Sequence, residues 1–214
     1  MAAYTDIDNP ELYFQSVLFT GNGSIASSTQ SITFDGSEDM QPDWVWFKKR
    51  NGADDHELFD SVRGVQKAID SNNNNAEASG RGLTAFNSDG FTVGNGSSAG
   101  NQGATNEINK TFVTWNWKAG TTGSGTTTGS GTGKAYSYSA NSTSGFQITK
   151  YVGNGTLGHT IPNHTGKIPT MIIFKQLNAS RGWGVYHKDL GANKIIYLDE
   201  NIAPQTIESN QWMN

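Results

Sequence analysis

Residues 42–48 read Pro-Asp-Trp-Val-Trp-Phe-Lys, and residues 169–175 read Pro-Thr-Met-Ile-Ile-Phe-Lys. In both stretches a short apolar run lies between a proline and a lysine. A short continuous apolar run bounded by polar and turn-forming residues is typical of a β-strand that is covered on both faces. The two stretches therefore predict the same strand twice in one chain.

The similarity extends along the chain on both sides of these strands. Upstream, Phe14-Gln15 recurs as Phe146-Gln147, and Gly21-Asn22-Gly23 recurs as Gly153-Asn154-Gly155. Self-similarity of this regularity indicates one duplicated structural unit. Residues 42–74 align with residues 169–201 without a gap, with identities at Pro42/Pro169, Phe47/Phe174, Lys48/Lys175, Asn51/Asn178, Gly64/Gly191, Lys67/Lys194, Ile69/Ile196 and Asn74/Asn201.

The secondary-structure pattern predicts an all-β fold, with a sandwich or jelly roll in each unit. Residues 112–117 alternate, which places Val113, Trp115 and Trp117 on one face of a half-buried strand. One short N-terminal helix is expected at residues 9–14, where Asn9 is a suitable cap and Pro10 the first helical residue.

We predict three segments. Residues 1–119 form the first β-sandwich repeat, residues 120–133 a linker, and residues 134–214 a second, truncated β-sandwich repeat. The linker prediction rests on GTTGSGTTTGSGTG, which contains no apolar, aromatic or charged side chain. The second repeat has no counterpart of residues 83–120. Either the chain is a fragment of a longer one, or a neighbour supplies the missing strands.

Composition excludes several classes of function. The chain has 15 basic and 19 acidic residues and a net charge of −4, which removes the electrostatic reason to expect a nucleic acid or an anionic membrane as partner. The absence of cysteine excludes disulfides, a thiolate nucleophile and cysteine-ligated zinc. Neither a membrane-length apolar run nor a signal peptide is evident, so we expect a soluble chain without membrane insertion.

Few residues suggest chemistry. Asp54-Asp55-His56-Glu57 is the densest ionisable group, but the aligned residues 181–184 are Arg-Gly-Trp-Gly, so a solvated loop is the better interpretation. Residues 35–39 resemble a plain turn more than a calcium loop, because they lack the spacing of an EF-hand. His159, His164 and His187 do not have a metal-ligand spacing. We therefore expect no catalytic residue, no metal site and no cofactor.

The tryptophans admit two interpretations, core packing or platforms for sugar rings. Trp44 and Trp46 share one strand face by parity, as do Trp115 and Trp117. The core is the favoured interpretation, and a glycan or partner contact remains the alternative. The candidates are Trp44, Trp46, Trp115, Trp117 and Trp183, with Trp212 as a further indole.

The sequence resembles the repeat found in tail-fibre and other virion proteins of tailed bacteriophages, especially marine ones, over nearly the whole chain. This resemblance implies a concanavalin-like or jelly-roll sandwich, and it supplies no catalytic residues. The motifs that carry it are YFQ and GNGS, PDWVWFKKR (42–50), LFDSVRG (58–64), LTAFNSDGFTVG, TWNWKAG, GFQITKYVGNGT (145–156), PTMIIFK and WGVYHKDLGA (183–192).

The resemblance leads to the hypothesis of a non-enzymatic virion structural protein, either the N-terminal, virion-attaching part of a tail fibre or another tail component. It would be made in the host cytoplasm and act by assembly with other virion proteins. We expect a homo-oligomer, with a trimer favoured. The alternatives are a carbohydrate-binding module for host surface glycans and a capsid decoration or adaptor protein.

Overall fold

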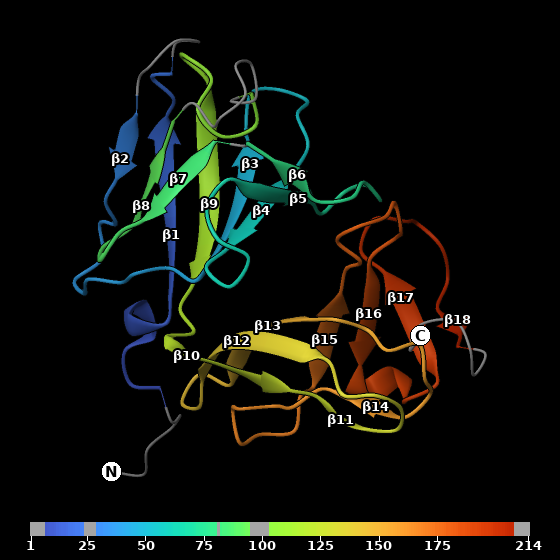
Figure 1. The fold of residues 1–214 in the computed structure, drawn as a ribbon. Helices are drawn as coiled ribbons and strands as arrows, with labels where there is room; N and C mark the ends of the chain where they lie inside the picture. The colour runs from blue at the N-terminus through green and yellow to red at the C-terminus, as the bar shows by residue number, and fades with distance from the viewer. Residues whose placement is uncertain (1–6, 24–28, 81, 95–102, 208–214) are drawn as a thin grey trace.

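The computed structural model describes residues 7–23, 29–80, 82–94 and 103–207, and nearly all the regular structure in these ranges is β-strand (Figure 1). The pairs between these strands are antiparallel. The expectation of an all-β fold is thus confirmed. Within the described ranges no helix is long and apolar enough to span a bilayer.

The expected N-terminal helix is reduced to a single 3-10 turn, η1 (Pro10–Leu12). Its cap is the predicted one, because the Asn9 side chain accepts a hydrogen bond from the backbone N–H of Glu11 at 3.1 Å. The helix cannot extend further because Phe14 already pairs with Trp117 in a β-ladder. Strand pairing therefore replaces a second helical turn.

The first unit consists of two antiparallel sheets that face each other, as Figure 1 shows. The larger sheet has the strand order β1-β9-β3-β4-β5-β6, and the smaller has the order β2-β8-β7. The strands are β1 (Phe14–Thr20), β2 (Gln30–Ile32), β3 (Trp44–Lys49), β4 (Glu57–Asp60), β5 (Lys67–Asp70), β6 (Ala78–Ser79), β7 (Leu83–Phe86), β8 (Phe91–Val93) and β9 (Thr111–Trp117).

The main hydrophobic core lies between these two sheets. Val45 and Phe47 of β3 point into it, and both are fully buried. Phe91 of the smaller sheet is the aromatic centre, with its ring 5.2 Å from that of Phe47 and 6.2 Å from that of Phe34. Edge-on aromatic pairs of this kind add to the stabilisation from buried area.

Strand β9 alternates as the sequence predicts, and its buried face is the polar one. Phe112, Thr114 and Asn116 are fully buried on the core side, whereas Trp115 and Trp117 lie on the opposite face. The Asn116 amide nitrogen is satisfied, because it donates to the carbonyl of Gln15 at 3.0 Å and to the Thr114 hydroxyl at 2.9 Å. The outer face of the large sheet is consequently rich in tryptophan.

The second unit contains a three-stranded sheet of order β10-β12-β13, a two-stranded pair β11-β14 and a four-stranded sheet of order β15-β16-β17-β18. A second 3-10 turn, η2 (Lys188–Leu190), follows β16. The strands are β10 (Thr121–Thr126), β11 (Thr128–Gly129), β12 (Ala135–Asn141), β13 (Phe146–Tyr151), β14 (His159–Thr160), β15 (Met171–Phe174), β16 (Gly184–His187), β17 (Lys194–Tyr197) and β18 (Gln205–Thr206).

The prediction that residues 120–133 are a flexible linker is wrong, because most of them belong to β10 and β11. Strand β10 pairs with β12 along its whole length. The tyrosine rings of β12 lie over the glycines of β10, and a Cβ on Gly123 would stand only 2.7 Å from the ring of Tyr138. Glycine therefore makes room for an aromatic cover, a tertiary role that composition does not reveal.

The duplication is confirmed at the level of strand register. Strands β15, β16, β17 and β18 begin 127 residues after β3, β4, β5 and β6. The pair Trp44↔Asp60 corresponds to Met171↔His187, and Glu57↔Asp70 corresponds to Gly184↔Tyr197. Lys67↔Ser79 likewise corresponds to Lys194↔Thr206. The two four-stranded arrays are one structure built twice.

Several of the identical residues have the same structural task in both units. Lys48 donates to the carbonyl of Asp54 at 3.2 Å, and Lys175 donates to the aligned carbonyl of Arg181 at 2.6 Å. Each lysine thus fastens the loop that follows its strand.

A second pair of lysines and a pair of glycines behave in the same way. Lys67 donates to the Ser79 hydroxyl at 2.8 Å, and Lys194 donates to the aligned Thr206 hydroxyl at 2.7 Å. Gly64 and Gly191 have φ angles of 92° and 86°, a region that favours glycine. These identical residues therefore have the same structural role in both units.

Candidate functional site

The outer face of the large sheet is a tryptophan surface. Trp44 pairs with Trp117 and Trp46 pairs with Trp115 across β3 and β9, so the four indoles lie side by side. The rings of Trp46 and Trp115 are 6.0 Å apart and nearly perpendicular. The four side chains form one surface, as their parity predicts, but this surface lies outside the sandwich core.

A groove of about 350 Å³ is open on this surface, and we call it the tryptophan groove. Its walls are Trp46, Trp115 and Trp117, and its polar lining is Lys48 and His56. Burial lowers the pKa of His56 below 6.5, and the nearby positive charge of Lys48 lowers it further, against an opposing effect of Asp55. At neutral pH the groove thus combines aromatic faces, one ammonium group and a neutral imidazole.

A second groove, of about 300 Å³, lies where the two units meet. Phe14 and Trp117 of the first unit and Phe146 of β13 line it. The ring centroids of Phe14 and Trp117 are 4.9 Å apart, and those of Trp117 and Phe146 are 6.4 Å apart. Aromatic contacts thus continue from the tryptophan surface onto the second unit.

Trp183 is not exposed, so the interpretation of this indole as an exposed sugar platform is wrong. It is 1% exposed and packs with Leu58 and Ile69 on the outer face of β4 and β5. Its indole N–H donates to the carbonyl of Asp70 at 2.8 Å and to that of Asn73 at 3.2 Å. Trp183 therefore anchors the second unit to the first. Trp212 lies outside the described residues.

The same junction is closed by a lysine of the second unit. Lys175 donates to the carbonyl of Asn74 at 3.1 Å, and its ammonium group lies 5.9 Å from the centre of the Trp183 ring. Burial lowers the pKa of Lys175, partly offset by Asp199 and Asp70. In the repeat, Trp183 aligns with His56 and Lys175 aligns with Lys48. Lys48 and His56 of the tryptophan groove thus occupy the repeat positions of the two residues that form this junction.

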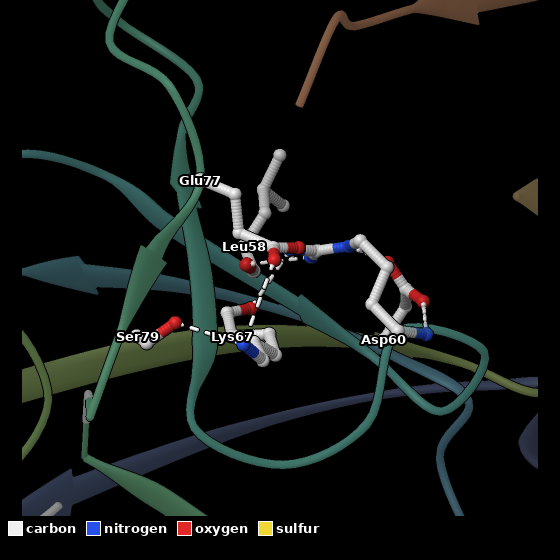
Figure 2. A network of polar contacts seen from close by, with 6 residues as sticks. Leu58, Asp60, Lys67, Glu77 and Ser79 are labelled. Atoms are coloured by element: carbon white, nitrogen blue, oxygen red, sulfur yellow. Dashed lines mark hydrogen bonds and ion pairs between the residues drawn. The ribbon is translucent and has the colours of Figure 1, made fainter. Parts of the chain in front are cut away.

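A buried ionic network holds the loop between β4 and β5 (Figure 2). The Arg63 guanidinium forms an ion pair with Asp60 and is 3.2 Å from a carboxylate oxygen of Glu77. It also donates to the carbonyl of Lys67 at 2.8 Å and to that of Leu58 at 3.0 Å. Figure 2 shows Leu58, Asp60 and Glu77 converging at this point, with Lys67 and Ser79 beside it. The network ties β4 to the loop that follows it, to the start of β5 and to Glu77 just before β6.

The acidic segment at residues 54–57 is divided between two environments. Asp54 and Glu107 form an ion pair with the buried Lys49 ammonium, whereas Glu57 is buried at the start of β4. Burial alone would lower the pKa of Lys49, but the hydrogen bonds that its ammonium group donates to these two carboxylates, and their negative charges, raise the pKa overall. In the described ranges no group of three His, Cys, Asp or Glu side chains is arranged to hold a metal ion.

The histidines of the second unit have structural neighbours. The His164 ring stacks on that of Tyr138 with centroids 3.6 Å apart, and the His159 ring contacts the Thr127 hydroxyl at 2.5 Å. His187 caps η2 by accepting from the backbone N–H of Asp189 at 3.4 Å. Each of these three histidine rings thus has a contact within the protein.

Sequence reasoning did not find the two polar residues of the tryptophan groove. In the sequence His56 stands among acidic residues, and Lys48 stands out only as an identity of the repeat. The signal was present in the alignment, because Lys48 and His56 match Lys175 and Trp183. Strand parity also places Lys48 on the same face of β3 as Trp46, whereas the position of His56, in the loop before β4, depends on the folded chain.

The fold defines an all-β protein with a duplicated antiparallel sheet and an aromatic outer surface. A family model described as a domain of unknown function, DUF7483, matches residues 9–214, and the chain belongs to this family. No match was found for the chain among curated proteins or among solved structures.

Proposed function

We propose that this protein is a structural component of a bacteriophage virion that acts by assembly, as the N-terminal, virion-attaching part of a tail fibre or as another tail component. The sequence resemblance suggests the virion. The observation that carries assembly is the open edge of β15. In the first unit the equivalent strand β3 lies between β4 and β9, whereas in the described residues of the second unit β15 pairs with β16 alone.

The exposure of apolar side chains supports this proposal. Phe47 is fully buried in the first unit, but its counterpart Phe174 is 37% exposed, and Met171 on the same strand is 50% exposed. Apolar side chains along an open strand edge favour association with another polypeptide. The second unit thus presents a surface that a partner would cover.

One identical side chain adds a specific indication. In the first unit the Asn51 side chain accepts a hydrogen bond from the backbone N–H of Thr111, the first residue of β9, at 3.0 Å. Its counterpart Asn178 accepts instead from the side chain of Gln176 at 3.0 Å. The second unit therefore keeps, as Asn178, the side-chain acceptor that binds the neighbouring strand β9 in the first unit.

The test is the absolute mass of the purified chain, measured by light scattering after size exclusion. We expect a mass of three 23.0 kDa chains, because the sequence resembles tail-fibre proteins and fibres are generally trimers. A mass of one chain at high protein concentration would contradict assembly by self-association. A mass of two chains, which falls to one chain on dilution, would support self-association but correct the copy number.

The tryptophan groove favours a second candidate function, recognition of a glycan. Indole faces can stack on the apolar faces of sugar rings, and the Lys48 ammonium can bind a carboxylate or hydroxyl group. Trp115, which is 36% exposed, is the indole most open to such a ligand.

Quenching of tryptophan fluorescence by host polysaccharide would test this second candidate. The Trp115→Ala variant should lose the quenching. Leu157→Ala is the control, because Leu157 is an exposed apolar residue of the second unit that does not line the tryptophan groove. Equal quenching in both variants would argue against the groove as a binding site.

A further inference from the structure

Most strand edges in the described part of the protein are protected against pairing with another chain. Short length, irregular pairing, charge and glycine are the usual means of protection. Strands β6, β11, β14 and β18 have two residues each, β2 has three, β7 has an irregular register at Leu83/Ala85, β13 carries Lys150, and β10 carries Gly123 and Gly125.

Two outer strands have none of these features. Strand β1 (FQSVLFT) is the edge of the first unit's large sheet, and β15 (MIIF) is the edge of the second unit's four-stranded sheet. Neither contains a charged residue, a proline or a glycine. An exposed uncharged edge of this length is a site for pairing with another strand.

We infer that the β15 edge of one copy pairs with the β1 edge of a second copy, so that the second unit of each chain joins the first unit of the next. This inference rests on the proposed assembly function and specifies its interface. The partner is a copy of the same chain because both unprotected edges occur in every copy, one on each unit.

The faces of the two strands agree with a continuous sheet. Gln15 and Val17 of β1 are buried on the core side, and Leu18 points outward with 62% exposure. On β15 the register match with β3 places Ile172 and Phe174 on the core side and Met171 on the outer side. Pairing would align core side with core side, and it would place the inward side chains of β1 beside Phe174 on the same face of the extended sheet.

A contact of this symmetry can join copies of the chain into a closed ring. Because the two edges are different strands, the contact is heterologous, and heterologous contacts generate rings when the rotation closes. Three copies joined in this way leave neither edge unpaired. Pairing of β15 with another β15 would instead give a two-fold dimer.

Cysteine cross-linking can distinguish these arrangements, because the natural chain has no cysteine. Leu18→Cys and Met171→Cys place thiols on the outward faces of the two edges. A short bismaleimide should join the double variant into covalent dimers and trimers on a denaturing gel. Each single variant should run as a single-chain band, because the strand that pairs with its cysteine-bearing strand contains no thiol.

Other patterns of cross-linking would overturn the inference. Cross-links from Met171→Cys alone would show β15 paired with itself, and cross-links from Leu18→Cys alone would show β1 paired with itself. If the wild-type chain is a trimer but the double variant forms no cross-link, assembly stands and this interface is wrong. A monomeric wild-type chain would contradict both self-association and this interface.

Discussion

At the scale of single residues, Trp183 and Trp46 show how one residue type serves different ends. The Trp183 indole N–H has two carbonyl partners at the junction of the units. The Trp46 indole N–H is shielded from solvent and has no hydrogen-bond partner in the described part of the chain. A buried donor without a partner costs stability, whereas a satisfied one contributes about 1 kcal/mol.

We therefore expect unequal effects from the same substitution at the two sites. Trp183→Phe should lower the free energy of unfolding by about 2 kcal/mol, because it removes two hydrogen bonds and leaves space at a buried site. Trp46→Phe should cost about 1 kcal/mol or less, since it also removes the unpaired donor. Urea denaturation of both variants measures the difference, and equal losses would contradict it.

His56 makes stability depend on pH. Its pKa is held below 6.5 in the folded protein, mainly by burial and then by Lys48. As the pH falls, His56 takes up a proton in the unfolded chain before it does so in the folded one. The contribution of the neutral His56 to the free energy of unfolding is therefore fully present above pH 6.5 and decreases as the pH falls below it.

The pH prediction is tested with a neutral replacement. His56→Gln should show a smaller decrease in melting temperature between pH 7.5 and pH 5 than the wild-type chain, because glutamine does not titrate. The groups that face His56 in this titration are Lys48 and Asp55. A decrease of the same size in both proteins would show that His56 is not the group responsible.

At the scale of elements, the loop between β4 and β5 depends on one buried cation. Arg63 and Asp60 are almost fully buried, and Glu77 is partly buried beside them. Removal of one partner from a buried ion pair leaves the other charged and unpaired. The second unit has Leu190 at the aligned position, so this network is specific to the first unit.

We expect Arg63→Leu to lower the free energy of unfolding by about 3–5 kcal/mol, because the Asp60 carboxylate then lacks its charge partner. Arg63→Lys should recover only part of this loss, since an ammonium group cannot reproduce the several directed contacts of a guanidinium. Denaturant titration gives both values. Full recovery by lysine would mean that charge alone matters at this position.

Secondary structure was predictable where repetition and periodicity agreed. The equivalence of Trp44–Lys49 and Met171–Phe174 followed from the alignment, and the strand register bears it out. The prediction for residues 120–133 failed for a physical reason: β10 is held by its ladder with β12, whose Tyr136 and Tyr138 rings pack on the glycines of β10. The composition of residues 120–133 gives no information about the tyrosines of β12 that pack on them.

At the scale of the whole molecule, the two units differ in how completely they are packed. The first has a core enclosed by two sheets, whereas the second is fixed to the first through Trp183 and exposes apolar side chains along β15. Assembly through that edge should therefore be sensitive to an added charge.

We expect Met171→Lys to reduce the oligomer to single chains, because a charge on the edge strand opposes pairing with another strand. Ile168→Lys is the matched control, since Ile168 is 91% exposed and lies just before β15 outside any strand. Light scattering should show an unchanged mass for this control. Dissociation of both variants would point to a general effect of charge.

The residue pattern was sufficient for the all-β class, the duplication and the pairing of tryptophans on one strand face, because these follow from local periodicity and from similarity between segments. The folded chain decided which strand face is buried, the different tasks of Trp46 and Trp183, the grouping of Lys48 and His56 with three indoles, and the open edge of β15. These features depend on which distant segments come together. That choice belongs to the packing of the whole chain and cannot be seen in any one of its stretches.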